Sequence, residues 1–259
     1  MFVDSHCHLQ LIDYDVLGIT EQTVITNAKV NNIKHFLCVA TRLEQHAKLL
    51  VLCKQYSEIC MSVGMHPNEL SNIIEPDKTD YLALVNHKHI IAIGETGLDY
   101  YKLTNDIETQ KKRFKTQIQV AIDCQKPLII HTRKATKDTI QILKEENAKN
   151  VGGVIHCFTE DQDFADEALA MGLYISFSGI ITFKHSRALQ DIAKRVPLDR
   201  ILIETDCPYL TPVPYRGKIN QPSHIIHTAH QIAKLREIKI EEFAQHTTKN
   251  YKRLFNINV

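Results

Sequence analysis

The sequence has no excess of charge of either sign and no long apolar run. Its 31 basic and 30 acidic side chains leave a net charge of +1, so any polyanion must be held by local contacts rather than by the charge of the whole protein. No apolar stretch has the length of a membrane-spanning helix, and the chain does not open with a basic segment followed by an apolar one. We therefore expect a cytoplasmic protein with no membrane partner.

The cysteine pattern excludes a disulfide framework. There are seven cysteines, an odd number, and most of them lie inside apolar runs, which is typical of reduced and buried thiols. Low-complexity segments, linkers and sequence repeats are also absent. With 259 residues the chain has the length of one (β/α)8 barrel, which needs roughly 250 residues. We therefore predict a single barrel hydrolase domain over residues 1–259.

Eight apolar, β-leaning runs recur along the chain, roughly thirty residues apart, with helical periodicity in stretches between them. Apolar runs that do not alternate with polar residues predict parallel strands covered on both faces. A doubly wound open sheet is the competing fold, but it often has a glycine-rich turn after its first strand, and this chain has none there. We predict an α/β protein, a TIM (β/α)8 barrel, with strands at 2–5, 35–40, 59–64, 90–94, 128–131, 154–156, 173–177 and 201–204 and with helices at 110–123, 139–145, 163–171, 187–196 and 240–255.

Side chains that bind metals collect where the predicted strands end, which is where a TIM barrel carries its chemistry. In the first strand, the alternation of side chains places Asp4, His6 and His8 on one face. Two imidazoles at this spacing can hold one divalent ion from one side. Later strand ends add four residues of metal-ligand type, namely Glu95, His131, His156 and Asp206.

Six ligands are too many for one catalytic ion, which usually takes three protein ligands, and they suit two divalent ions bridged by a carboxylate. The first and eighth strands are neighbours in a closed barrel, so one ion is assigned to His6, His8 and Asp206. The second ion is assigned to His131 and His156, with Glu95 as the bridge between the ions. Nitrogen and oxygen donors without sulfur suit Zn²⁺, Mn²⁺ or Mg²⁺.

Five further residues are expected to support the site. Asp4 either orients the ligand histidines or accepts backbone hydrogen bonds, and Glu204 either faces the site or fixes the ligand loops. His66 ends the third strand, and Arg133 and Arg216 lie on loops that follow strands. We expect these last three residues to bind substrate, the arginines through phosphate groups.

Aromatic and basic residues close to these positions allow more than one interpretation. Tyr100, Tyr101 and Phe183 can offer rings on which bases stack, or they can pack in the core. The basic run KKR at 111–113 lies on a predicted helix, and we expect it to be a solvated face.

Several motifs together resemble the TatD family of metal-dependent deoxyribonucleases. They are DSHCHL at 4–9, GETGLDY at 94–100, HTR at 131–133, HCF at 156–158, FSG at 177–179 and ETDCPYL at 204–210. The resemblance implies a TIM barrel of the metallo-dependent hydrolase type with two divalent ions, and 3′→5′ exonuclease action on single-stranded DNA. A related branch removes D-amino acids from tRNA. One departure is NQP at 220–222, where the family commonly has Asn-Glu-Pro.

We predict from these motifs a deoxyribonuclease that cleaves DNA phosphodiester bonds with a water activated by two metals. Asp206 and Glu95 are the predicted catalytic residues, with Asp206 as general base. The alternative is a D-aminoacyl-tRNA deacylase, or another ester or amide hydrolase with the same two-metal site. The run at 90–94 contains no lysine that could be modified to bridge metals, as in many amidohydrolases, which favours the phosphodiester prediction. A third possibility is a non-catalytic scaffold that binds a metal or a partner. Such a scaffold is expected to lack some of the metal ligands, but all six are present here. The predicted partner is single-stranded DNA, without an obligate protein partner, and we expect a monomer.

Overall fold

Eight parallel strands form one sheet in the order β1 to β8 in the computed structural model of the chain. The structure describes residues 1–70 and 75–257. All eight predicted strands are present, and with the helices between them they form a TIM (β/α)8 barrel, as predicted. The strands are β1 (Phe2–Cys7), β2 (Ile33–Cys38), β3 (Ile59–Val63), β4 (Ile90–Asp99), β5 (Leu128–Arg133), β6 (Gly153–Ile155), β7 (Tyr174–Phe177) and β8 (Ile201–Ile203).

The chain divides into two compact units, which are considered one at a time. The first unit comprises Met1–Cys38 and Ile175–Val259. Its α-helices are α1 (Tyr14–Leu17), α2 (Glu21–Val30), α8 (Arg187–Arg195), α9 (Ile225–Leu235) and α10 (Ile240–Phe255).

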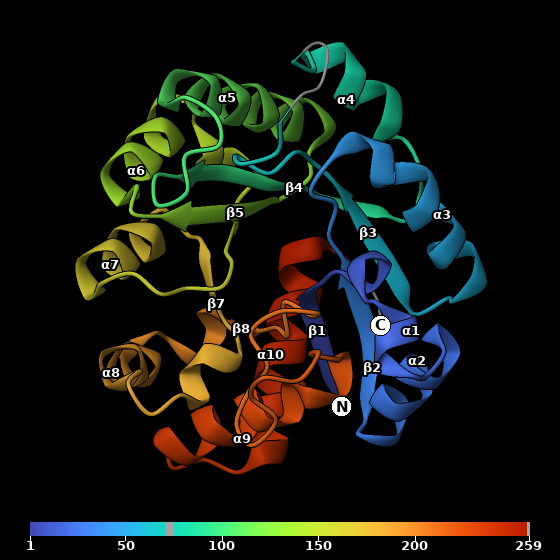
Figure 1. Cartoon of the computed structure of the whole chain (residues 1–259). Helices are drawn as coiled ribbons and strands as arrows, with labels where there is room; N and C mark the ends of the chain where they lie inside the picture. The colour runs from blue at the N-terminus through green and yellow to red at the C-terminus, as the bar shows by residue number, and fades with distance from the viewer. Residues whose placement is uncertain (71–74, 258–259) are drawn as a thin grey trace. The chain divides into compact units, whose positions relative to one another are not determined.

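Strands β1 and β8 are joined in this unit just beyond their carboxyl ends. The backbone N–H of Asp206 donates to the His6 carbonyl (2.9 Å), and the N–H of His8 donates to the Cys207 carbonyl (2.8 Å). Helix α10 lies against both strands (Figure 1). Its buried Asn250 donates two hydrogen bonds to the Leu198 and Ile201 carbonyls at 2.9 and 2.8 Å. The last helix therefore supports the strands that carry the first ligands.

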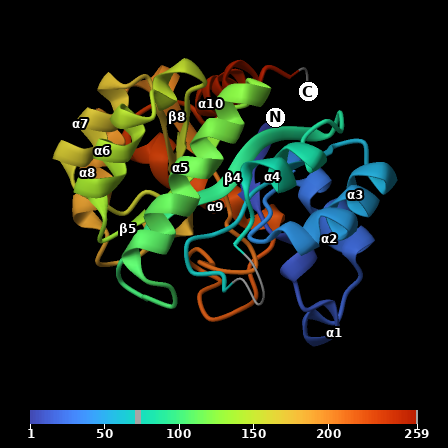
Figure 2. The same cartoon turned by 90° about the horizontal axis from the view of Figure 1, so that it is seen from above.

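The second unit comprises Val39–Tyr174. Its helices are α3 (His46–Gln55), α4 (Lys78–Leu84), α5 (Ile107–Cys124), α6 (Thr136–Glu145) and α7 (Gln162–Ala170). Helix α5 packs along β4 (Figures 1 and 2). Phe114, Ile118 and Ala121 lie on its buried face, and Asp106 begins the helix by accepting a hydrogen bond from the Thr109 N–H (2.9 Å).

One prediction about α5 is wrong. The basic run at 111–113 is not simply a solvated face, because the Arg113 side chain is only 1% exposed and pairs with Glu75. Its guanidinium also donates to three backbone carbonyls. Burial of this cation is possible because its hydrogen-bond donors find acceptors. Lys111 likewise binds Asp138 at 2.8 Å.

All seven cysteines are free thiols; four of them are buried, as predicted, whereas Cys60, Cys124 and Cys157 are only partly buried. Among residues 1–70 and 75–257, no helix combines the length and the apolar character needed to cross a bilayer.

A close approach between β4 and β5 requires glycine at position 97. The backbone of Gly97 has φ +135°, and a Cβ placed there would overlap the His131 carbonyl oxygen. Gly172 offers a comparison, because it also has a positive φ (+79°) but has open space around its missing Cβ. Alanine substitutions at the two positions can therefore be compared to separate the free-energy cost of the clash from that of the backbone conformation.

We expect Gly97→Ala to destabilise the protein more than Gly172→Ala. The change at 172 introduces only left-handed strain, about 1–2 kcal/mol, whereas the change at 97 adds overpacking worth a further ~1–3 kcal/mol. Urea unfolding of both variants and the parent measures the difference. Equal losses in the free energy of unfolding would contradict the close approach.

Candidate metal centre

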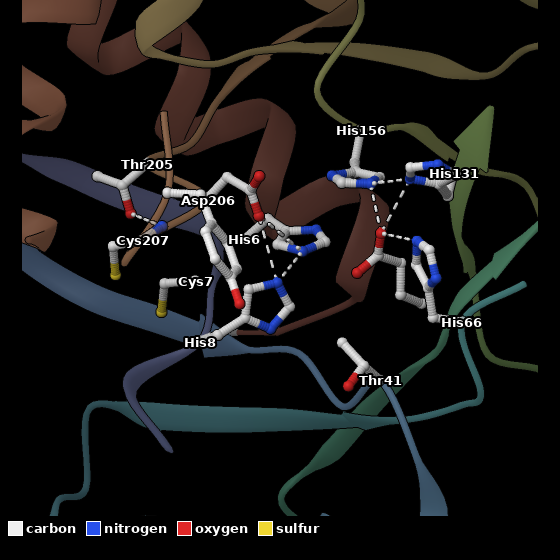
Figure 3. A network of polar contacts seen from close by, with 12 residues as sticks. His6, Cys7, His8, Thr41, His66, His131, His156, Thr205, Asp206 and Cys207 are labelled. Atoms are coloured by element: carbon white, nitrogen blue, oxygen red, sulfur yellow. Dashed lines mark hydrogen bonds and ion pairs between the residues drawn. The ribbon is translucent and has the colours of Figure 1, made fainter. Parts of the chain in front are cut away.

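The first group of ligands lies in the first unit, where β1 ends and the loop after β8 begins. The Nε2 atoms of His6 and His8 are 3.1 Å apart. The Asp206 Oδ1 atom lies 3.6 Å from the His6 nitrogen and 3.2 Å from the His8 nitrogen. Figure 3 shows the three side chains turned toward one another. We call this group the first triad.

The second group of ligands lies in the second unit, at the ends of β4, β5 and β6. Glu95 Oε1 is 3.1 Å from His131 Nδ1 and 2.8 Å from His156 Nε2. The two imidazole nitrogens are 3.3 Å apart, and Figure 3 shows the His131 and His156 rings close together. We call this group the second triad.

Both triads have the spacing that a single divalent ion requires. Donor atoms about 2.0–2.2 Å from a tetrahedral ion are about 3.3–3.6 Å from one another. The donor separations are 3.1–3.6 Å in the first triad and 2.8–3.3 Å in the second. The separations come within about 0.5 Å of the tetrahedral value, and each triad brings together residues that the sequence analysis assigned to one ion. Metal binding by these residues stays a prediction. The bridging role of Glu95 stays a prediction.

The hydrogen bonds around His131 identify the atom that faces a metal. Its Nε2 lies 3.3 Å from Asp99 Oδ2, so Nδ1 points at Glu95 and His156. A neutral ring with its proton on Nε2 would aim a lone pair at a carboxylate, which is unfavourable unless a proton or a metal cation lies between them. Burial opposes the charged ring, but hydrogen bonds to Asp99 and Glu95 outweigh it and raise the pKa of His131.

The charge of Glu95 is favoured for the same reason. Burial alone would raise the pKa of this carboxyl, but the neighbouring His156 and His66 rings and the hydrogen bonds from His131 and His156 hold it well below its usual range. The Glu95 carboxyl is therefore ionised near pH 7.

Asp99 is a functional residue that the sequence interpretation did not identify. It binds the outer nitrogen of His131 and also accepts hydrogen bonds from the N–H groups of Tyr101 (2.9 Å) and Lys102 (3.1 Å). Burial raises the pKa of Asp99, but these bonds overcome that effect and lower it to about 2. Such a carboxylate fixes the tautomer of a ligand histidine. Because β4 continues to Asp99, strand alternation places it on the same face as Glu95.

Asp4 supports the first triad through backbone contacts, one of the two roles expected for it. Its carboxylate accepts hydrogen bonds from the Thr205 N–H (2.9 Å) and hydroxyl (2.6 Å). Burial, together with the charge of Glu204, raises the pKa of Asp4 to about 7. Glu204 is itself fully buried, and its role stays a prediction.

Asn220 holds the other side of the ligand loop. Its buried amide donates to the Thr205 carbonyl (2.8 Å) and the Tyr209 carbonyl (2.6 Å), which flank Asp206 in the sequence. The departure from the family motif falls on the next residue, Gln221, so these hydrogen bonds are kept.

The three residues expected to bind substrate lie in three different settings. His66 Nε2 is 3.5 Å from Glu95 Oε1, beside the second triad. Burial lowers the pKa of His66 to about 3, so its ring is neutral near pH 7. In the second unit, the guanidinium carbon of Arg133 lies 3.8 Å above the Tyr101 ring.

In the first unit, the guanidinium carbon of Arg216 lies 3.8 Å above the Phe183 ring. Each of the two predicted arginines is thus stacked on one of the three rings proposed as stacking surfaces, whereas the third, Tyr100, donates a hydrogen bond to Asp138 at 2.7 Å. Tyr101 is largely exposed, with 64% of its surface accessible, and so is not a core residue.

The fold and the two triads define the class of protein: a metal-dependent hydrolase built on a TIM barrel. The model of the family described as TatD related DNase matches residues 3–256, and the chain belongs to the TatD family. The metal-dependent hydrolase YcfH of Escherichia coli is 44% identical over 99% of this chain and 96% of its own length. YabD of Bacillus subtilis, also described as a metal-dependent hydrolase, is 41% identical over the whole of both chains.

A solved structure agrees with this assignment. The crystal structure of YJJV, a TatD homologue from E. coli, superposes with a TM-score of 0.92 at 25% identity, covering 99% of this chain and 98% of the other.

We expect Asp99→Asn to weaken metal binding at the second triad by about 10- to 100-fold. The amide cannot hold the His131 proton on Nε2 as the carboxylate does, so the ligand nitrogen is no longer fixed toward the ion. Competition with a fluorescent chelator measures the affinity. Asp163→Asn, in the first turn of α7, is the control, and an equal effect of both changes would contradict the assignment.

Acidification is expected to release metal from the second triad. The raised pKa of His131 lets protons compete with the ion at a higher pH than they would at an imidazole with the ordinary value of 6.5. Affinity should therefore begin to fall, as the pH is lowered, at a pH above the ordinary imidazole value of 6.5. Chelator competition at a series of pH values measures this, and an affinity that stays constant down to pH 5 would contradict it.

Proposed function

We propose that this protein is a deoxyribonuclease that removes nucleotides from the 3′ end of single-stranded DNA. The proposal rests on one observation: each of the two triads combines nitrogen and oxygen donors at separations that fit one divalent ion. A phosphodiester is an anion that repels an attacking hydroxide, so its hydrolysis benefits from two cations more than the cleavage of a neutral ester does.

Two stacked cation and ring pairs support a nucleic acid as substrate. Arg133 on Tyr101 and Arg216 on Phe183 each combine a donor for phosphate with an aromatic surface for a base. A protein with a net charge of +1 must gather a strand through such local contacts. The polarity and the preference for single strands rest on the resemblance to the TatD family.

The residues of the two triads have distinct roles in the proposed reaction. The ions would neutralise phosphate oxygens and lower the pKa of a bound water to about 7. Asp206 would hold one ion and would accept the proton of the water as general base. Glu95 is ionised and ligates the other ion, and its sharing between the two ions is part of the proposal. His66, neutral near pH 7, donates a hydrogen bond to a phosphate oxygen.

We expect Glu95→Gln and His156→Ala to lower the rate of DNA trimming by at least about a hundredfold, because each change removes a ligand of the second triad. The assay follows the shortening of an end-labelled single strand in the presence of Mn²⁺ or Mg²⁺. EDTA should abolish the activity and added metal should restore it. Glu242→Gln, an exposed carboxylate on α10, is the matched control.

Three substrates separate the proposal from its alternative. Labelled single-stranded DNA, duplex DNA and a D-aminoacyl-tRNA are compared at equal concentrations with the same metal. Preferential shortening of the single strand from its 3′ end supports the proposal. Release of the amino acid without cleavage of DNA would instead establish the deacylase, with the same dependence on both triads.

A further inference from the structure

The segment at 65–69, which carries His66, is held by side chains rather than by regular secondary structure. It follows β3, and in it the Nη1 atom of Arg113 donates to the carbonyls of His66 (2.8 Å), Pro67 (3.2 Å) and Glu69 (2.9 Å). Three carbonyls of the loop thus accept hydrogen bonds from one buried nitrogen. The position of the loop therefore depends on the place of the guanidinium.

The opposite edge of the guanidinium is fixed by Glu75. Arg113 Nη2 donates to one carboxylate oxygen at 2.7 Å, and Nε donates to the other. This bidentate ion pair needs the planar guanidinium group of arginine, which lysine lacks. Arg113 therefore acts as a rigid spacer between Glu75 and the loop.

A second side chain of α5 binds the start of the same segment. Gln117 is fully buried, and its amide accepts a hydrogen bond from the Met65 N–H (2.9 Å) and donates one to the Met65 carbonyl (3.0 Å). Asn105 adds donors to the Pro67 and Glu69 carbonyls, each at 2.8 Å. The backbone on both sides of His66 is thus anchored to α5 and to the loop before it.

The anchored backbone decides which nitrogen of His66 carries its proton. The Asn68 N–H donates to Nδ1 of the ring at 3.1 Å, so Nδ1 is an acceptor and the proton lies on Nε2. That proton faces Glu95 Oε1, 3.5 Å away. The ring also lies edge-on to His131, with 4.5 Å between the centroids, and Figure 3 shows His66 beside His131. A shift of the loop would therefore move the Nε2–H donor at the second triad.

We propose that Arg113 and Gln117 are positioning residues that act through His66, keeping its Nε2–H directed into the second triad. Neither residue ligates a metal or touches substrate. The kinetic consequence rests on the proposed function, whereas the effect on the histidine ring does not.

The kinetic test uses Arg113→Lys, which keeps the positive charge but removes the planar guanidinium group. At saturating metal we expect kcat for single-stranded DNA to fall about tenfold, since small displacements of a hydrogen-bond donor cost this much or more, while KM and metal affinity change by less than about twofold. In a His66→Ala background the same substitution should produce no further loss, because no ring remains to be positioned.

Val120→Ala is the matched control. It creates a cavity in the same helix, where Val120 is fully buried, and so lowers stability without removing any hydrogen bond to the segment at 65–69. Its kcat should equal that of the parent. Equal losses from Arg113→Lys in the parent and in the His66→Ala background would overturn the proposal, as would an unchanged kcat.

A measurement independent of activity follows the ring itself. In the protein labelled with ¹⁵N-histidine, the His66 signals, assigned by their loss in His66→Ala, should show a single tautomer with the proton on Nε2. Arg113→Lys and Gln117→Met should convert them to a tautomer mixture. Unchanged signals in both variants would overturn the proposal even if DNA is cleaved, whereas a mixture in a protein without nuclease activity would contradict the proposed function alone.

Discussion

The two triads of this protein are governed by one constraint, namely that lone pairs directed at a common point repel one another. In each triad two imidazole nitrogens and a carboxylate oxygen point at a common position with separations of 2.8–3.6 Å. Side chains placed in this way are stable only when a positive charge lies among them. The raised pKa of His131 and the lowered pKa of Glu95 both express this requirement, because the cluster draws protons when it has no other cation.

The surrounding polypeptide fixes the ligands against this repulsion. Asp4 and Asn220 bind the backbone on either side of Asp206, and Asp99 binds the outer nitrogen of His131. None of these three side chains belongs to a triad. The rigidity that a binding site needs is therefore supplied by buried polar residues with complete hydrogen bonding, not by the ligands themselves.

The strands and the ligands could be predicted from the sequence because both depend on local patterns. Apolar runs marked all eight strands, and residues of metal-ligand type at their ends marked both triads. Five α-helices were not predicted, because their own apolar patterns are weak. In α9 the buried face includes Thr228, Ala229 and Ala233, which are small or weakly apolar, and in α3 the apolar Leu50 and Val51 lie outside the buried stripe and blur its period.

Interactions between distant parts of the chain could not be predicted in this way. Arg113 was assigned to solvent because its neighbours in the sequence are lysines, but burial depends on Glu75 and on a loop nearly fifty residues away. Asp99 was missed because the end of β4 was placed five residues too early. In both cases the deciding partner lies on another element, and nothing in the local sequence identifies it.

The two triads also differ in how far apart their members lie along the chain, and this affects the order in which they can assemble on the ribosome. All ligands of the second triad have been synthesised once residue 156 has emerged, whereas His6 and His8 must wait for Asp206, which joins β1 through the backbone. During synthesis from the amino end, the triad that contains the histidines of β1 is thus the last to be completed. Until Asp206 is synthesised, these two histidines lack the carboxylate that lies beside them in the folded protein.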